Sequence, residues 1–223
     1  KRIWLNELKN LKKDREILGA KMKKAKFYKK KLKNGLTILF EKRKLPIISV
    51  ALGVRFGSGY EKEDEKGIAH FIEHMLFKGT KKRTAKQISE EIEDKGGEHN
   101  AFTAKTLTAA WLKLPSKYLE FSIEILSDLF YNSKFDPQEI EKERKAILEE
   151  IKMYHDSPAR HVFEKLAELM YDKPYGISPL GTIESVSCFK RDDLLEKYKK
   201  NFFTSNFILA VVGDADFDEI CRL

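Results

Sequence analysis

The residues of this sequence best suited to chemistry are two histidines and a glutamate in the stretch His70-Phe71-Ile72-Glu73-His74. On an α-helix, at about 100° per residue, positions i, i+3 and i+4 lie on one face. Both imidazoles can therefore bind one metal ion while the carboxylate of Glu73 faces the same point. Hydrolysis at zinc needs such ligands, an open position for water and a carboxylate that moves protons. The order H-x-x-E-H is the inverted form of the H-E-x-x-H metal-binding helix.

The neighbouring residues predict that this stretch is helical. Gly67 precedes it, and Gly79 follows it as a C-terminal cap. At the helical period the apolar side chains fall on the face opposite the histidines, so the back of the helix can pack in a core. A surface helix that carries two histidines by chance is the alternative, because a five-residue motif has false positives. The apolar face consists of Ile68, Ile72, Met75 and Leu76.

A zinc site needs a third protein ligand, and the predicted helix over residues 137–154 offers candidates. At the helical period Glu143 and Glu150 lie about 60–80° to one side of the apolar stripe through Ile140, whereas Glu149 lies about 180° away, in solvent. Burying an unpaired carboxylate is costly, and a zinc ion would compensate it. A lysine would do so equally well, so the spacing alone leaves both a ligand and a salt bridge open.

Together these motifs resemble the pitrilysin-type metallopeptidases, or inverzincins, which include mitochondrial processing peptidase and insulin-degrading enzyme. The resemblance runs from about residue 32 to the C-terminus, with several independent motifs in the family's order. Besides the two glutamate positions and H-x-x-E-H, the similar stretches are Gly35-Leu36-Thr37-Ile38-Leu39, Gly57-Ser58-Gly59-Tyr60-Glu61, Asn100-Ala101-Phe102-Thr103, Tyr175-Gly176 and Val211-Val212-Gly213-Asp214.

The resemblance implies a role for each residue of the metal motif. His70, His74 and Glu150 are expected to bind one Zn²⁺ per chain. Glu73 is then the general base that activates water, and passes the proton to the leaving amine. Glu143 is the outer carboxylate that the family places near the metal, where it orients a ligand histidine.

The resemblance also implies a substrate and a partner. Asn100, Ala101 and Phe102 would line a cleft in which an extended peptide adds to the edge of a sheet. A half-buried strand with Phe102 in the core is the alternative for these three. Members of the family have a second, similar half or a partner subunit, which supplies an Arg and a Tyr near the zinc. This chain stops at Leu223, so we expect that half to be absent and a dimer or hetero-oligomer to complete the site.

The function implied is that of a zinc-dependent endopeptidase that needs a partner domain or subunit. A non-catalytic subunit, which binds peptides without cutting them, is the alternative, and the complete set of site residues argues against it. S-ribosylhomocysteine lyase also carries an H-x-x-E-H helix, but its third ligand is a cysteine. Neither Cys188 nor Cys221 lies at a comparable distance from the motif.

The net charge of +8 is concentrated at one end of the chain. Residues 1–35 hold 14 of the 43 Lys and Arg but 3 of the 35 Asp and Glu. We therefore divide the chain into a basic, helical N-terminal extension over residues 1–34 and a zinc-binding catalytic domain over residues 35–223. A basic amphipathic helix can bind membranes or nucleic acid. No aromatic-interleaved basic motif accompanies it, so we expect it to pack on protein, with neither nucleic acid nor a membrane as partner.

The remaining pattern predicts the α+β class, with helices on one face of a mainly antiparallel sheet, because strands and helices interleave without a regular βαβ rhythm. Strands are expected at residues 36–42, 47–56, 98–104, 107–114 and 207–212. Helices are expected at residues 66–78, 84–94, 116–131, 137–154, 158–171 and 191–201.

Overall fold

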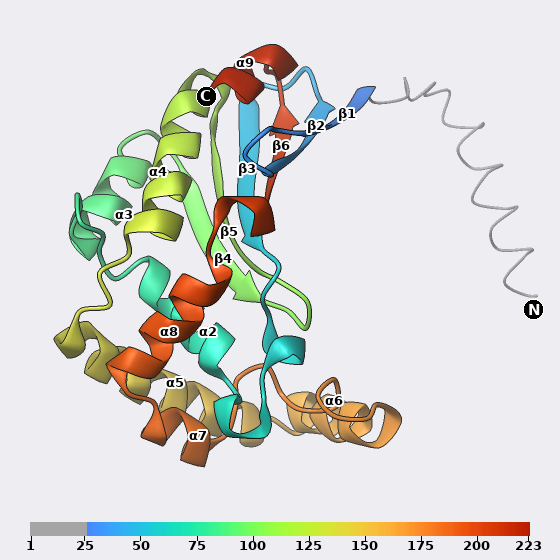
Figure 1. The fold of residues 1–223 in the computed structure, drawn as a ribbon, viewed down its shortest axis with the longest axis vertical. Helices are drawn as coiled ribbons and strands as arrows, with labels where there is room; N and C mark the ends of the chain where they lie inside the picture. The colour runs from blue at the N-terminus through green and yellow to red at the C-terminus, as the bar shows by residue number, and fades with distance from the viewer. Residues whose placement is uncertain (1–25) are drawn as a thin grey trace, which may run out of the picture.

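The centre of the fold is a six-stranded sheet, seen in a computed structural model that describes residues 26–223. The strand order is β1-β2-β6-β3-β5-β4, and only the β2–β6 pair is parallel (Figure 1). This arrangement confirms the α+β class and the mainly antiparallel sheet. The strands are β1 (Lys26–Lys31), β2 (Thr37–Lys42), β3 (Ile47–Val54), β4 (Glu98–Thr103), β5 (Thr108–Pro115) and β6 (Phe207–Gly213).

Strand β1 differs from the expectation for the N-terminal extension. Residues 26–31 pair antiparallel with β2 instead of being helical, so the sheet begins before the boundary set at residue 34. Tyr28 holds the strand in place, because its ring stacks on Phe40 at 5.7 Å and on Phe217 at 5.0 Å. Four lysines among six residues conceal this strand in the sequence. The helix expected further upstream falls on residues 1–25, outside the described residues.

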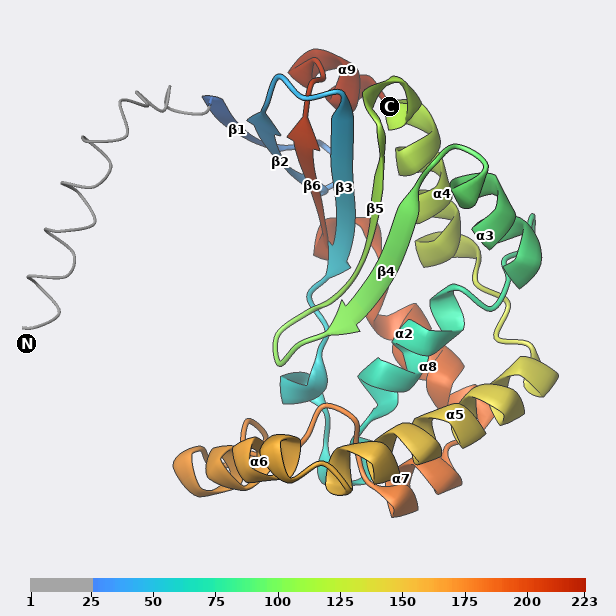
Figure 2. The ribbon, with the colours of Figure 1, turned by 180° about the vertical axis from the view of Figure 1, so that it is seen from behind.

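The helices divide into two groups around the sheet. Helices α3, α4 and α9 lie on one face, with α4 packed on β3 and β5. Helices α2, α5, α7 and α8 pack together at one end of the sheet (Figure 2). The helices are α2 (Ile68–Leu76), α3 (Ala85–Glu93), α4 (Leu119–Asn132), α5 (Pro137–His155), α6 (Pro158–Met170), α7 (Ile183–Cys188), α8 (Arg191–Asn201) and α9 (Phe217–Arg222).

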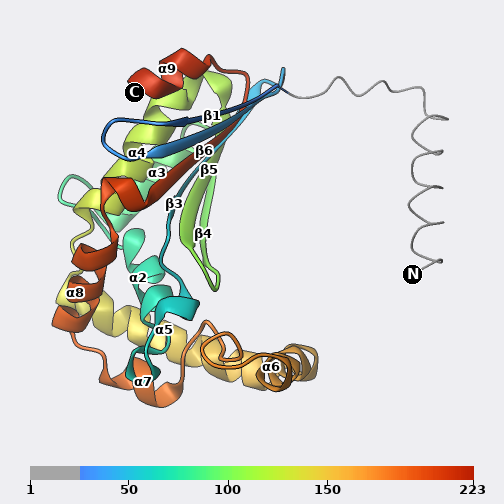
Figure 3. The same ribbon diagram turned by 45° about the vertical axis from the view of Figure 1, so that its right-hand side comes forward.

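The opposite face of the sheet carries no helix among residues 26–223. Strand β3 shows why the two faces differ: Val50 and Leu52 are buried on the helix side, whereas Ala51 and Gly53 point to the bare side. Helix α6 projects from the end of the sheet on this bare side, so the sheet and α6 form two walls at an angle (Figure 3). Within the described residues no helix is both long and apolar enough to cross a lipid bilayer.

Helix α2 packs its apolar back into the core as expected, since Ile68, Ile72 and Leu76 are at most 1% exposed. Its N-terminus lies against the loop before α7 through two glycines. Gly67 has φ 90°, and a Cβ there would lie 2.6 Å from the carbonyl oxygen of the residue before Gly181. Both positions therefore require glycine, because the conformation and the contact each exclude a side chain.

A buried carboxylate closes the same helix end. Glu61 is 5% exposed, and its carboxylate accepts hydrogen bonds from the backbone N–H groups of Gly67 at 3.1 Å and Ala69 at 2.9 Å. The ammonium of Lys66, itself buried, donates to the backbone carbonyl of Glu61 at 3.0 Å. Helix N-termini present unpaired N–H groups and a partial positive charge, which a carboxylate satisfies.

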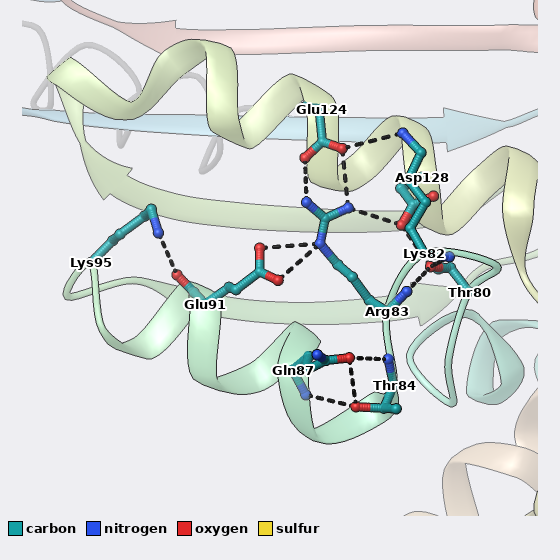
Figure 4. A network of polar contacts seen from close by, with 9 residues as sticks. All are labelled: Thr80, Lys82, Arg83, Thr84, Gln87, Glu91, Lys95, Glu124 and Asp128. Atoms are coloured by element: carbon teal, nitrogen blue, oxygen red, sulfur yellow. Dashed lines mark hydrogen bonds and ion pairs between the residues drawn. The ribbon is translucent and has the colours of Figure 1, made fainter.

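The loop after α2 is joined to α3 and α4 by the side chain of Arg83 (Figure 4). Its guanidinium binds Glu91 at 3.1 Å, Glu124 at 2.8 Å and Asp128 at 3.0 Å. Asp128 is 2% exposed and also accepts a hydrogen bond from Thr80 at 2.6 Å. The network thus fixes the chain that leaves α2 to the helices that cover the sheet.

The burial of Glu61 predicts a pH dependence of stability. Burial raises the pKa of Glu61 from 4.5 to about 7, so the folded protein binds this proton more tightly than the unfolded chain. That stabilisation is complete below pH 4.5 and is lost as the pH rises through about 7. We expect the free energy of unfolding, measured relative to Glu61→Gln, to fall by up to about 3 kcal/mol across this range. Urea denaturation at a series of pH values measures this free energy. The same pH dependence in the unaltered chain and in Glu61→Gln would contradict the prediction.

Replacing Arg83 is expected to destabilise the fold. Arg83→Met leaves the carboxylate of Asp128 buried without its cation, which should lower the free energy of unfolding by about 3 kcal/mol. Lys82→Met is the matched control, because Lys82 makes an exposed ion pair with Glu124 at 3.6 Å. Such pairs contribute less than about 1 kcal/mol. Equal losses in the free energy of unfolding for the two variants, measured by urea denaturation, would show that the buried pair contributes no more than the exposed one.

Candidate metal centre

The structure brings together the three residues expected to bind metal. Nε2 of His70 and Nε2 of His74 lie 3.2 Å apart on successive turns of α2. Oε2 of Glu150, on α5, lies 3.6 Å from each of these nitrogens. Among residues 26–223, His70, His74 and Glu150 form the group of side chains whose ligand atoms lie close enough together to hold one metal ion. Glu149 points away and pairs with Lys152 on the surface, as the helical period predicts.

The spacing of these three atoms fits a zinc ion. Zinc binds imidazole nitrogen and carboxylate oxygen at about 2.0–2.1 Å in tetrahedral geometry, which places neighbouring ligand atoms about 3.3 Å apart. The observed separations of 3.2, 3.6 and 3.6 Å form one triangular face of such a tetrahedron. Two neutral nitrogens and one carboxylate are also the donor set of several catalytic zinc sites, which leave the fourth position open.

Glu73 lies beside this cluster on the same helix. Burial raises the pKa of its carboxyl group, and Thr103 Oγ1 on β4 donates a hydrogen bond to its Oε2 at 2.8 Å. A raised pKa makes the carboxylate a better proton acceptor. Thr103 holds one oxygen and leaves the other free.

The two histidines have different surroundings. Burial, and next to it the neighbouring His74, lower the pKa of His70 to about 4. Burial also opposes the charge on His74, but hydrogen bonds to Glu143 and Glu150 outweigh it and raise that pKa to about 9. Glu143 lies 3.0 Å from Nδ1 of His74 and 2.8 Å from the ammonium of Lys78. Glu143 is thus placed as expected, behind the histidine and outside the triangle of ligand atoms.

A cavity of about 540 Å³ opens beside the cluster. Its walls come from α2, β4, α5, α6 and the loop before α7. Ala101 and Phe102 line it, but Asn100 does not, although Asn100 shares a face of β4 with Phe102. Phe102 is 46% exposed, so the alternative that places it in the core is wrong.

Sequence reasoning assigned no role to several residues that the structure brings to the site. Thr103 follows Ala101 at the two-residue period of a strand, and Tyr154 follows Glu150 by one helical turn, so both could have been found from spacing. Lys105, from the β4–β5 turn, and Phe163, from α6, line the cavity through tertiary packing alone. No local pattern in the sequence indicates those two.

Comparison with known sequences agrees with this geometry. The chain is 40% identical over 201 residues to an uncharacterized zinc protease of Rickettsia bellii, covering 89% of this chain and 49% of that protein. It is 36% identical over 193 residues to the mitochondrial-processing peptidase subunit beta of Bos taurus, covering 86% of this chain and 39% of that protein. The chain therefore spans half or less of the length of these relatives.

Comparison with solved structures gives the same result. A protease from Helicobacter pylori superposes with a TM-score of 0.83 at 26% identity, over 89% of this chain and 49% of that one. The model of the insulinase family, peptidase family M16, matches residues 37–183, which include His70, His74 and Glu150 and the helices that carry them. By sequence, fold and family model alike, this chain belongs to the insulinase family of peptidases, family M16.

Proposed function

We propose that this chain is the zinc-binding half of an endopeptidase that hydrolyses extended peptides. The observation that carries the proposal is the triangle formed by His70, His74 and Glu150 beside the half-buried carboxylate of Glu73, at the wall of a cavity. Zinc protease names among the relatives support the metal. His70 and His74 come from α2 and Glu150 comes from α5, and these two helices pack on each other.

Each residue of the site has a defined task in this proposal. Zinc bound at the triangle would make water more acidic and polarise a peptide carbonyl. Glu73 takes the proton of the attacking water and passes it to the leaving amine, while Thr103 holds the carboxylate in place. Glu143 accepts the Nδ1–H of His74, which leaves Nε2 of that ring free to bind metal. Lys78 balances the charge of Glu143.

The outer edge of β4 suits an extended peptide. Within the described residues β4 pairs with β5 on one side, and its other edge forms no ladder. A peptide that adds there would use its backbone groups, with Ala101 and Phe102 beside it in the cavity. Such binding depends on the backbone more than on the substrate's sequence, because main-chain hydrogen bonds carry it.

We further propose that a second half or a partner subunit completes the site. The bare face of the sheet and the projecting α6 form two walls that no helix of the described residues closes (Figure 3), and residues of β4 and α6 line the cavity. Exposed apolar side chains on α6 support such a partner, since contiguous apolar patches mark interaction surfaces. These side chains are Val162, Phe163, Leu166, Leu169 and Met170.

The experiment that tests the proposal measures zinc content and peptide cleavage by this chain, alone and with a second half or subunit supplied. One zinc per chain with cleavage after recombination supports it. One zinc without cleavage in either case would make the chain a non-catalytic peptide-binding subunit instead. Absence of bound zinc would overturn the assignment of the ligands.

Removal of the proposed base should separate metal binding from catalysis. Glu73→Gln retains the size of the side chain but cannot accept a proton, so hydrolysis by the recombined enzyme should fall at least about 10²–10⁴-fold. Zinc content should be unchanged, since Glu73 is not a ligand. Cleavage at an undiminished rate by the variant, measured with a fluorogenic peptide, would exclude Glu73 as the base.

The third ligand can be tested against its neighbour in the sequence. Glu150→Ala removes an oxygen from the triangle and should weaken zinc binding at least about tenfold, whereas Glu149→Ala should leave it unchanged. Competition with a chromophoric chelator measures both affinities. Similar losses in the two variants would show that the carboxylate of Glu150 does not bind the metal.

A further inference from the structure

The first metal ligand lies in the least supported part of its helix. His70 is the third residue of α2, and the first intrahelical hydrogen bond runs from the N–H of Phe71 to the carbonyl of Gly67 at 2.9 Å. The N–H groups before Phe71 thus lack partners within the helix. The N-cap residue is Gly67, which has no side chain to accept them. The position of His70 therefore depends on groups outside the helix.

Glu61 supplies those groups from the preceding loop. Its two carboxylate oxygens accept from Gly67 and Ala69, the residues on either side of the helix start. A single carboxylate that accepts hydrogen bonds from two N–H groups restrains both the rotation and the axial position of the first turn. Burial of the carboxylate raises the pKa of Glu61, and the nearby cation of Lys66 offsets part of that rise.

Other contacts bring the same turn toward the loop before α7. Ser185 Oγ, at the start of α7, donates to the carbonyl of Lys66 at 2.6 Å, and the backbones at Gly67 and Gly181 are in contact. Neither of these two contacts accepts a hydrogen bond from an N–H group of the first turn. Glu61 is the one side chain of the described residues that accepts from Gly67 and Ala69.

We propose that Glu61 is a positioning residue for the metal centre, which holds the first turn of α2 so that His70 meets His74 and Glu150 in the arrangement that binds metal. This inference rests on the proposed function. It concerns the distance between ligands rather than the stability of the fold, because His74 lies a turn further along α2 and is supported by intrahelical hydrogen bonds. Loss of Glu61 would therefore displace one ligand relative to the other two.

The test compares metal binding and helix protection in the whole chain. Glu61→Gln leaves one oxygen for two N–H groups, and Glu61→Asp keeps the charge but shortens the side chain by one methylene. Both variants should bind zinc and cobalt at least about tenfold more weakly. The visible absorption bands of bound cobalt should shift, because they report ligand geometry. In the metal-free chain, the amides of residues 67–70 should exchange with solvent faster.

Thr84→Ala is the matched control, because Thr84 caps α3, which like α2 is nine residues long, by accepting from the N–H of Gln87 at 3.2 Å. It should leave the metal affinity and the cobalt bands unchanged. If both Glu61 variants keep the affinity and bands of the unaltered chain while Glu150→Ala loses them, the positioning role is overturned and the proposed function stands. Failure of the unaltered chain to bind either metal would overturn both.

Discussion

Helices α2 and α5 cross with their buried stripes in one apolar core, and the ionisable side chains of the site lie along the edge of that contact. The two helices are far apart in the sequence, so tertiary packing alone sets the distance from His70 and His74 to Glu150. The core supplies the free energy that brings an acid and two bases out of water. Everything else around the site either fixes the ends of these helices or shapes the cavity beside them.

Charge compensation follows a consistent pattern around this contact. Each carboxylate at this contact has a defined partner: Glu61 has the start of α2, the half-buried Glu73 has Thr103, and Glu143 has His74 and Lys78. Glu150 has the two histidine nitrogens, which a metal ion would draw toward itself. Every one of these partners lies on α2 or next to it, so this short helix is the common neighbour of the carboxylates at the site.

The parts of the site that periodicity determines could be predicted from the sequence. The helical period distinguished Glu150 from Glu149, and it placed the apolar back of α2 in the core. The resemblance to a family, not the spacing, was the ground for expecting Glu150 to be a ligand rather than a salt-bridge partner. The order and type of the longer strands and helices also followed from pattern, because each has one apolar face.

The parts that escaped prediction depend on contacts without a local pattern. Strand β1 is rich in lysine and is held by a single aromatic side chain, so its composition favoured a solvated helix. Glu61 lies in a loop with no periodicity, and its partners are backbone groups that the sequence does not distinguish. Asn100 was expected in the cleft with its neighbours. It shares a face of β4 with Phe102 but lies outside the cavity, whose extent depends on packing with α5 and α6.

The contact between Gly67 and Gly181 has a consequence for how this domain tolerates change. With no side chain on either residue, the loop before α7 lies directly on the backbone at the start of α2. A methyl group at either position would push the start of α2 and the loop before α7 apart. Helix α2 carries both His70 and His74, so such a change would move the two histidines together. Sequence variation is therefore restricted at these two positions, although neither belongs to the cluster of His70, His74 and Glu150.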